Sequence, residues 1–104
     1  MPKESEIRKK AIAILTDENW IYWYPAKVKY KQTDIFGIID ILALKGKRKK
    51  NIQLTTISNI SIRRRKITSF LTKFKVELPV EIWAWNQKKK KFKKEKVSIK
   101  IKKP

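Results

Sequence analysis

The chain has 104 residues, with 28 Lys and Arg against 9 Asp and Glu, so its formal net charge is +19. This length suits one small domain, and 41% hydrophobic residues provide one core, so we expect residues 1–104 to form a single domain. The absence of His and Cys excludes disulfides, thiolate catalysis, Cys-based zinc sites and His-based chemistry, and a total of two glycines excludes glycine-rich nucleotide-binding loops.

The first half of the chain predicts one helix and two strands. Apolar residues at positions 7, 11, 14 and 15 recur at helical spacing and predict a helix over Lys3–Thr16. Trp20–Lys31 is rich in strand formers, and Pro25 places this strand at an edge or at a bulge. Ile35–Leu44 is apolar on both faces except for Asp40, a pattern typical of a central strand.

The second half predicts three strands and another helix. A basic hairpin loop over Lys45–Lys50 leads into a third strand, Asn51–Thr56, which we expect to be antiparallel to the second. Helical spacing follows over Ile60–Lys75, then strand formers over Val80–Trp85 and alternation over residues 96–102. The order predicts an α/β domain with a mixed five-stranded sheet flanked by two helices.

One acidic residue stands among apolar neighbours. A carboxylate inside an apolar strand is costly to bury unless it is protonated, paired or bound to a metal, and Asp40 is that residue. Gln53 and Thr55 are two apart on the next strand, so they share a face, and a hairpin would place them beside Asp40. The alternatives are that Asp40 pairs with Lys or Arg at the sheet end, and that Gln53 and Thr55 form the polar face of an edge strand.

The stretch Asp34–Ala43 followed by Ile52–Thr56 resembles the PD-(D/E)XK nuclease superfamily, and is most similar to archaeal Holliday-junction resolvases and related viral nucleases. The order αβββαβ is also similar, so the resemblance covers nearly the whole chain. It implies a restriction-endonuclease-like core. It also implies a DNA endonuclease that depends on Mg²⁺ or Mn²⁺ and hydrolyses phosphodiester bonds, with branched DNA such as a Holliday junction as substrate.

The resemblance also implies roles for individual residues. Asp40 and Gln53 would be metal ligands, with the main-chain carbonyl of Leu54 as a third oxygen, and hard Mg²⁺ accepts such a set. Glu6 would be the acid of the first helix, although a carboxylate there also suits the helix dipole. Asp34 is a secondary candidate for the acid, and the alternative is that it forms a turn.

The sequence departs from the family pattern at the motif lysine. Thr55 occupies that position among the catalytic candidates, and a hydroxyl brings no positive charge to the attacking water. Some family members carry the lysine on the following helix, from which Arg64, Arg65 or Lys66 would reach back.

The charge of the chain points to a polyanionic partner, and we expect DNA, because binding releases condensed counterions. No apolar run is long enough for a membrane span, so we expect a cytoplasmic protein without a membrane partner. The residues predicted to contact DNA phosphates are Arg63, Arg64, Arg65 and Lys66 on the second helix and Lys47, Arg48, Lys49 and Lys50 in the hairpin loop.

Several functional alternatives remain at this point. Cleavage of a junction needs two active sites, so a chain of this size is expected to form a homodimer. A non-catalytic basic DNA-binding protein with a degenerate nuclease fold is the main alternative, and Thr55 favours it. A third is an RNA-binding module that stacks bases on Tyr22, Trp23, Tyr24 and Phe92. For Trp83 and Trp85, core or dimer packing is favoured over base stacking.

Overall fold

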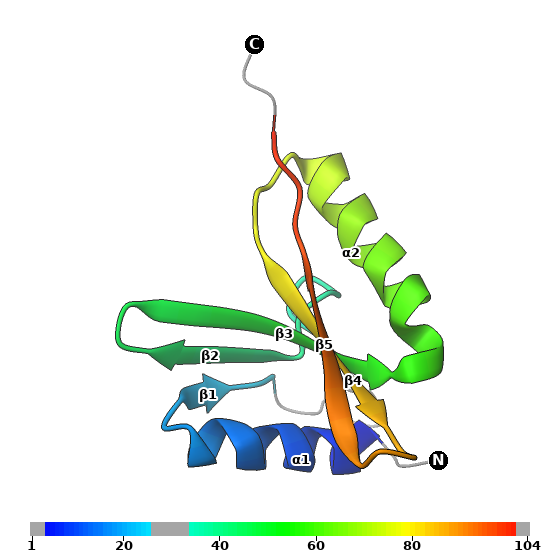
Figure 1. Ribbon diagram of the computed structural model, residues 1–104. Helices are drawn as coiled ribbons and strands as arrows, with labels where there is room; N and C mark the ends of the chain where they lie inside the picture. Colours follow the sequence, from blue (N-terminus) through cyan, green and yellow to red (C-terminus); the bar gives the residue numbers. More distant parts are fainter. Residues whose placement is uncertain (1–3, 26–33, 102–104) are drawn as a thin grey trace.

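The computed structural model describes residues 4–25 and 34–101, which form one sheet with two helices packed against it (Figure 1). The elements are, in chain order, α1 (Glu4–Asp17), β1 (Ile21–Trp23), β2 (Ile41–Lys45), β3 (Arg48–Thr56), a 3-10 turn (Ile57–Asn59), α2 (Ile60–Phe74), β4 (Val80–Asn86) and β5 (Lys91–Val97). This order confirms the predicted α/β architecture. Within the described ranges, no helix is long and apolar enough to cross a membrane.

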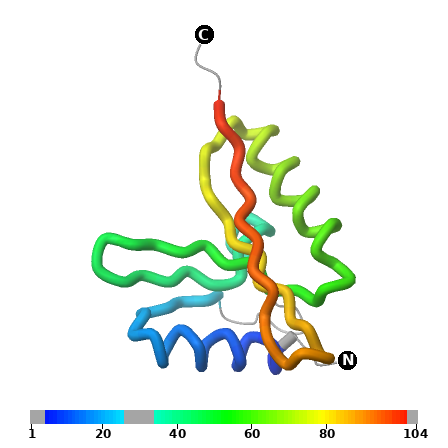
Figure 2. Tube along the Cα trace, viewed as in Figure 1, coloured from blue at the N-terminus to red at the C-terminus, as the bar shows by residue number. Residues whose placement is uncertain are grey.

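The five strands lie in the sheet in the same order as in the chain, and the trace can be followed in Figure 2. β1 pairs with β2, β2 with β3, and β4 with β5 in antiparallel fashion, whereas β3 and β4 are parallel. Parallel neighbours need a crossover connection, and α2 provides it. The sheet is therefore mixed, as predicted, and β3 lies at its centre.

One face of the sheet is covered by α1, and we call it the α1 face. Ile7, Ala11 and Leu15 recur every four residues along α1 and are buried against the sheet. Their partners in the same core include Ile52 and Leu54 of β3 together with Trp83 and Trp85 of β4. Both tryptophans are therefore core residues, in agreement with the favoured prediction.

The opposite face is covered by α2, and we call it the α2 face. Ile67 and Leu71 of α2 pack there against Val80 and Ile82 of β4, in a core that also includes Val97. Gln53 is paired with Ile82 across the β3–β4 ladder, and directly paired residues point to the same side of a sheet. Gln53 therefore lies on the α2 face.

Strand β3 is buried on both faces, but its two faces differ in chemistry. Ile52 and Leu54 belong to the core under α1, while Asn51, Gln53 and Thr55 alternate with them and point toward the α2 face. All five residues are buried. The centre of the sheet thus presents a row of buried polar side chains to one side only.

The prediction of a central strand over Ile35–Leu44 is wrong in its first half. Ile35 and Ile39 close a tight turn through two backbone hydrogen bonds of 2.8 and 3.0 Å. Phe36 and Gly37 inside this turn have positive φ values of 54° and 72°. Glycine tolerates that conformation, which a strand does not contain, so the chain turns there and β2 begins only at Ile41. Ile38 and Ile39 instead fill the core under α2, and Ile35 packs against it.

Three other boundaries differ from the predictions. The first strand, expected over Trp20–Lys31, covers Ile21–Trp23 in the described part of the chain, and positions 26–31 lie outside the described residues. The loop expected over Lys45–Lys50 is a turn of two residues, because Lys45 pairs directly with Arg48. The last strand is β5 at Lys91–Val97, not residues 96–102. An edge strand tolerates lysines on its open side, so the basic run extends the sheet.

The β2–β3 turn depends on Gly46, whose φ is +59°. A glycine at the first central position is typical of two-residue hairpins whose twist matches the strands. A Cβ atom at Gly46 meets nothing within 4 Å, so the replacement changes only backbone energy. We expect Gly46→Ala to lower the free energy of unfolding by about 1 kcal/mol. Urea denaturation measures this, with Lys47→Ala as the neutral control, and equal stability of the two variants would contradict the assignment.

Candidate functional site

The candidate site lies where β2 and β3 separate. The β2–β3 ladder ends at Ile41 opposite Ile52, and the N–H of Asp40 donates one further hydrogen bond of 2.7 Å to the carbonyl of Ile52. Beyond this point β3 continues from Gln53 to Thr56 beside β4 alone. Asp40 thus stands at the fork between the two strands, directly before β2.

The carboxylate of Asp40 closes this fork. Its Oδ2 atom accepts a hydrogen bond of 2.6 Å from the backbone N–H of Leu54 and another of 2.6 Å from Nε2 of Gln53. The exposed fractions of Asp40 and Gln53 are 6% and 1%. The carboxylate supplies Leu54 with the acceptor that β2 no longer provides, and hydrogen bonds to a charged acceptor are stronger than neutral ones. The sequence prediction that Asp40 and Gln53 meet is therefore confirmed.

The other end of the Gln53 amide is the unusual feature of the site. Because Nε2 must face the carboxylate, the oxygen Oε1 points away from it. This oxygen is buried and accepts no hydrogen bond from any residue of the described ranges. Buried acceptors are nearly always satisfied, so Oε1 marks a place for a water molecule or a cation.

A third oxygen comes from the main chain. The N–H and C=O of one residue leave a strand on the same edge, so the carbonyl of Leu54 is directed to the same edge as the N–H that Asp40 accepts. Carboxylate, amide and carbonyl oxygens are ligands that Mg²⁺ prefers. Within residues 4–25 and 34–101, no three His, Cys, Asp or Glu side chains gather into a group that could hold a metal ion. A divalent ion at the fork would therefore have one carboxylate, one amide oxygen and one main-chain oxygen as protein ligands, with water completing its coordination.

Thr55, at the position of the family's lysine, is buried on the α2 face. Its exposed fraction is 6%, and it pairs with Ala84 of β4. The hydroxyl therefore lies on the same side of β3 as Gln53, but it brings no positive charge there. A cation must come from another element if the site has one.

Arg63 is the basic residue that the sequence reasoning about this cation missed. It lies three residues after Ile60 and four before Ile67, both buried, so it belongs to the stripe that α2 turns to the sheet. Its Nε atom is buried and donates to no acceptor of the described residues. The helical spacing alone would have identified it.

Contacts of its neighbours show which way Arg63 faces. Phe70, seven residues later on the same side of α2, packs on Phe36 with ring centroids 5.9 Å apart, and Phe36 belongs to the turn that leads into Asp40. Arg64, by contrast, donates a hydrogen bond of 2.8 Å to Glu95 on β5. Arg63 therefore lies on the same side of α2 as Phe70, which contacts the turn before Asp40.

The three basic residues that the sequence favoured for this role have other surroundings. The hydrogen bond from Arg64 lowers the pKa of Glu95 and raises that of Arg64. Arg65 and Lys66 are exposed on α2. All three lie outside the buried stripe.

The structure does not bring Glu6 onto this arrangement, whereas Asp34 stays close to Asp40 in the chain fold, because Ile35 and Ile39 pair in antiparallel fashion. Glu6 is exposed on α1, which packs on the opposite face of the sheet from Gln53. Asp34 is half-buried and directly precedes the turn closed by Ile35.

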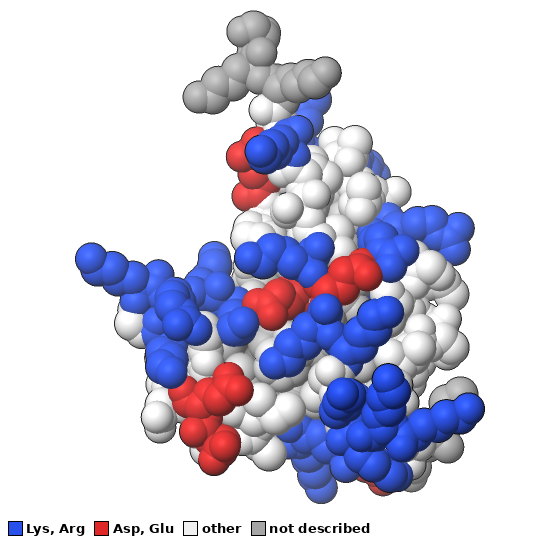
Figure 3. Space-filling model, viewed as in Figure 1, with Lys and Arg blue, Asp and Glu red and all other residues white. Residues whose placement is uncertain are grey.

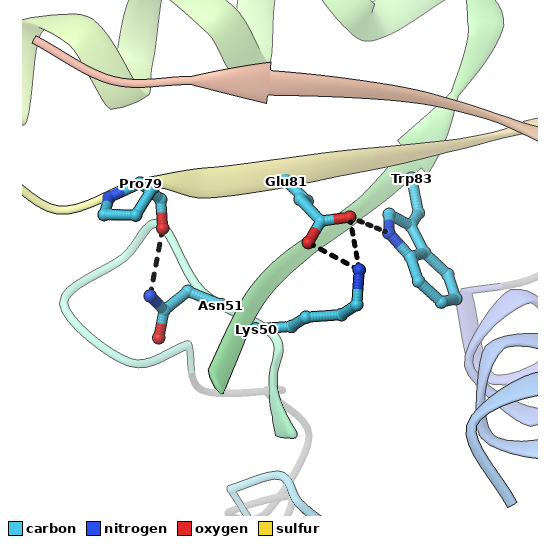
Figure 4. Close-up of polar contacts among 5 residues, drawn as sticks. All are labelled: Lys50, Asn51, Pro79, Glu81 and Trp83. Atoms are coloured by element: carbon cyan, nitrogen blue, oxygen red, sulfur yellow. Dashed lines mark hydrogen bonds and ion pairs between the residues drawn. The ribbon is translucent and has the colours of Figure 1, made fainter. Parts of the chain in front are cut away.

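The basic residues of the hairpin differ in their contacts, and the guanidinium of Arg48 lies 5.0 Å from the centre of the Trp20 ring. Lys47, Arg48 and Lys49 are exposed, and Lys and Arg side chains gather around the hairpin at the left of Figure 3. Lys50 is half-buried, and its ammonium forms an ion pair of 3.0 Å with Glu81. Glu81 also accepts a hydrogen bond of 3.2 Å from the indole of Trp83 (Figure 4). Lys50 thus ties β3 to β4.

Asn51 makes a related connection on the other face of β3. Its Nδ2 donates a hydrogen bond of 3.0 Å to the carbonyl of Pro79, directly before β4 (Figure 4). This contact fixes the start of the parallel β3–β4 pair, two residues from Gln53.

No protein-family model matches the chain, and no curated protein matches its sequence at a significant level. The likeness to the PD-(D/E)XK nucleases therefore rests on the residues and topology described above.

The hydrogen bonds of Asp40 predict a large effect on stability. Asp40→Ala leaves two buried donors without their acceptor, and each such group costs about 1–3 kcal/mol, so we expect the free energy of unfolding to fall by about 2–4 kcal/mol. Asp40→Asn retains one acceptor oxygen and should lose less than half as much. Urea denaturation measures both variants. A loss below about 0.5 kcal/mol for Asp40→Ala would contradict this description of the fork.

Proposed function

We propose that the protein is a metal-dependent DNA endonuclease whose active site lies at the fork between β2 and β3. The observation that carries the proposal is the buried pair of Asp40 and Gln53, in which the amide donates to the carboxylate and its own oxygen accepts no hydrogen bond from the described residues. Buried acceptors are nearly always satisfied by protein, water or an ion, and the proposal assigns a metal ion to this oxygen. The element order, αβββαβ followed by β5, supports a restriction-endonuclease-like core.

The oxygen set would hold Mg²⁺ or Mn²⁺ through Asp40, Gln53 and the carbonyl of Leu54. A bound ion of this kind polarises a phosphate and generates a hydroxide nucleophile at neutral pH. Asp40 supplies the negative charge of the set. Its hydrogen bond to Gln53 fixes the direction of the amide oxygen.

Arg63 is the residue best placed to supply the positive charge that Thr55 lacks. A guanidinium stays charged at every relevant pH and offers several N–H donors to phosphate oxygens. Its Nε donates to no acceptor of the described residues, and Arg63 lies on the same side of α2 as Phe70, which contacts the turn before Asp40. In this arrangement Arg63 stabilises charge on the scissile phosphate.

The exposed basic residues would bind the rest of the DNA. Lys47 and Lys49 in the hairpin and Arg65 and Lys66 on α2 lie on either side of the fork and are free to contact phosphates. Such contacts give affinity without base readout and make it depend steeply on salt. Branched DNA is the substrate we propose, cut by a homodimer that supplies two sites.

A specific observation also favours the second candidate, a DNA-binding protein without catalysis. Oδ2 of Asp40 is already engaged by two N–H donors, and Thr55 stands in place of the lysine. Both features are expected of a fork that retains its structural hydrogen bonds and does not catalyse hydrolysis.

Cleavage of a labelled four-way junction and of a matched duplex tests the proposal. We expect products with Mg²⁺ or Mn²⁺, none with EDTA, and none from Asp40→Asn, since this variant removes the one negative charge of the metal site. A melting curve of Asp40→Asn establishes that it is folded. Binding without product at any metal concentration would reject the enzyme and favour the second candidate.

Arg63→Gln and Arg65→Gln form a matched pair on the same helix. Removal of a preorganised donor to a transition state typically lowers the rate about 100-fold or more, and we expect this for Arg63→Gln. Arg65→Gln should change the rate by less than about threefold, because a single exposed phosphate contact contributes little. Equal rates for the two variants would remove Arg63 from the mechanism.

A further inference from the structure

The half of the α2 face that α2 does not cover carries exposed apolar side chains. Ile21, Trp23 and Leu44 on β1 and β2 are 67%, 57% and 45% exposed. Together with Tyr22, Leu42 and Lys49, they line a shallow, largely apolar hollow. Soluble proteins seldom leave contiguous apolar surface of this kind without a binding role.

Strand pairing places this surface on the same side of the sheet as the fork. Leu44 is paired with both Ile21 and Lys49, so these three side chains form one row. Trp23, Leu42 and Asn51 form the next row. Asn51 is two residues before Gln53 and points to the same face, so the row of Trp23 adjoins the row of the candidate site.

The surroundings of the patch are basic. Lys49 belongs to the patch itself, and Lys47 is exposed at the tip of the same hairpin. The hairpin carries the gathering of positive side chains in Figure 3. A second copy of the chain on this patch would bring two such hairpins together against the repulsion of a +19 charge on each chain. A ligand with both an aromatic surface and negative charge would pack its aromatic surface in the apolar hollow and pair its negative charge with the lysines.

We propose that Ile21, Trp23 and Leu44 form a stacking platform for unpaired DNA bases, with Lys49 on the adjoining phosphate. Bases stack on exposed aromatic rings irrespective of sequence, but only when they are not stacked in a duplex. The platform therefore selects DNA with unpaired bases, such as a flap or an open junction, and presents its backbone to the fork. This deepens the proposed function, because it names the substrate of the same site.

Tryptophan fluorescence isolates the platform. Trp20, Trp83 and Trp85 are 5%, 1% and 7% exposed, so Trp23 is the one solvent-exposed tryptophan of the chain. Titration in EDTA with a single-stranded oligonucleotide should quench its red-shifted emission, while the matching duplex leaves it nearly unchanged. Because no metal is present, the result does not depend on cleavage.

Variants of exposed aromatic residues complete the experiment. Trp23→Ala should weaken binding of single-stranded DNA at least tenfold and leave duplex binding unchanged, and Trp23→Phe, which keeps a ring, should restore most of it. Phe74→Ala removes an exposed aromatic ring at the end of α2, outside the hollow, so it is the matched control and should bind normally. Melting curves show that the variants are folded.

The outcomes separate this proposal from the proposed function. Equal DNA binding by Trp23→Ala and wild type, or a dimer in sedimentation that Trp23→Ala converts to monomer, would overturn the platform even if the protein cleaves DNA. Quenching and selectivity as described would support the platform even if no metal ion yields product.

Discussion

The hydrogen bond from the Leu54 N–H to the carboxylate of Asp40 is the interaction on which the centre of the protein depends. Where β2 leaves the sheet, β3 would otherwise present an unsatisfied donor in a buried place. The carboxylate fills that position, and the Gln53 amide fixes it from the side. Hydrogen bonds to a carboxylate offset part of the cost of burying it, and the proposed metal site uses the same group. The carboxylate of Asp40 thus stabilises the centre of the sheet and is also the charged group of the proposed active site.

The division of the sheet into two faces determines what can meet at the fork. The α1 face is a continuous apolar core, and it holds the tryptophans of β4 and the covering helix. The α2 face carries the polar row of β3, the buried stripe of α2 with Arg63, and the uncovered strip around Trp23. A substrate lying across this face would meet the fork between a guanidinium on one side and an apolar strip on the other. The basic hairpin extends beside it and adds attraction for phosphates.

Much of this arrangement follows from the sequence, for identifiable reasons. Alternation of polar and apolar residues is enough to put Gln53 and Thr55 on one face, and a hairpin is enough to bring Asp40 beside them. The turn at Phe36 and Gly37 could not be predicted, because a run of apolar residues indicates burial but does not show where the backbone changes direction. The last strand was predicted over residues 96–102 and not at Lys91–Val97, because the pattern does not show which strand lies at the edge of the sheet and can carry a run of lysines. The position of Arg63 could have been predicted from the sequence, since helical spacing alone places it on the buried stripe of α2.

The proposed active site requires that a divalent cation binds at the fork between β2 and β3. An amide NMR spectrum of the folded protein contains separate signals for the Leu54 N–H and for the side-chain amide of Gln53, both held by Asp40. Titration with Mn²⁺ broadens the signals of nuclei close to a bound ion. We predict that these two signals broaden first, at a metal concentration that leaves the hairpin and α2 unaffected, and that Asp40→Asn abolishes the effect. Broadening confined to exposed carboxylates such as Glu18 or Glu77, with both fork signals intact, would contradict it.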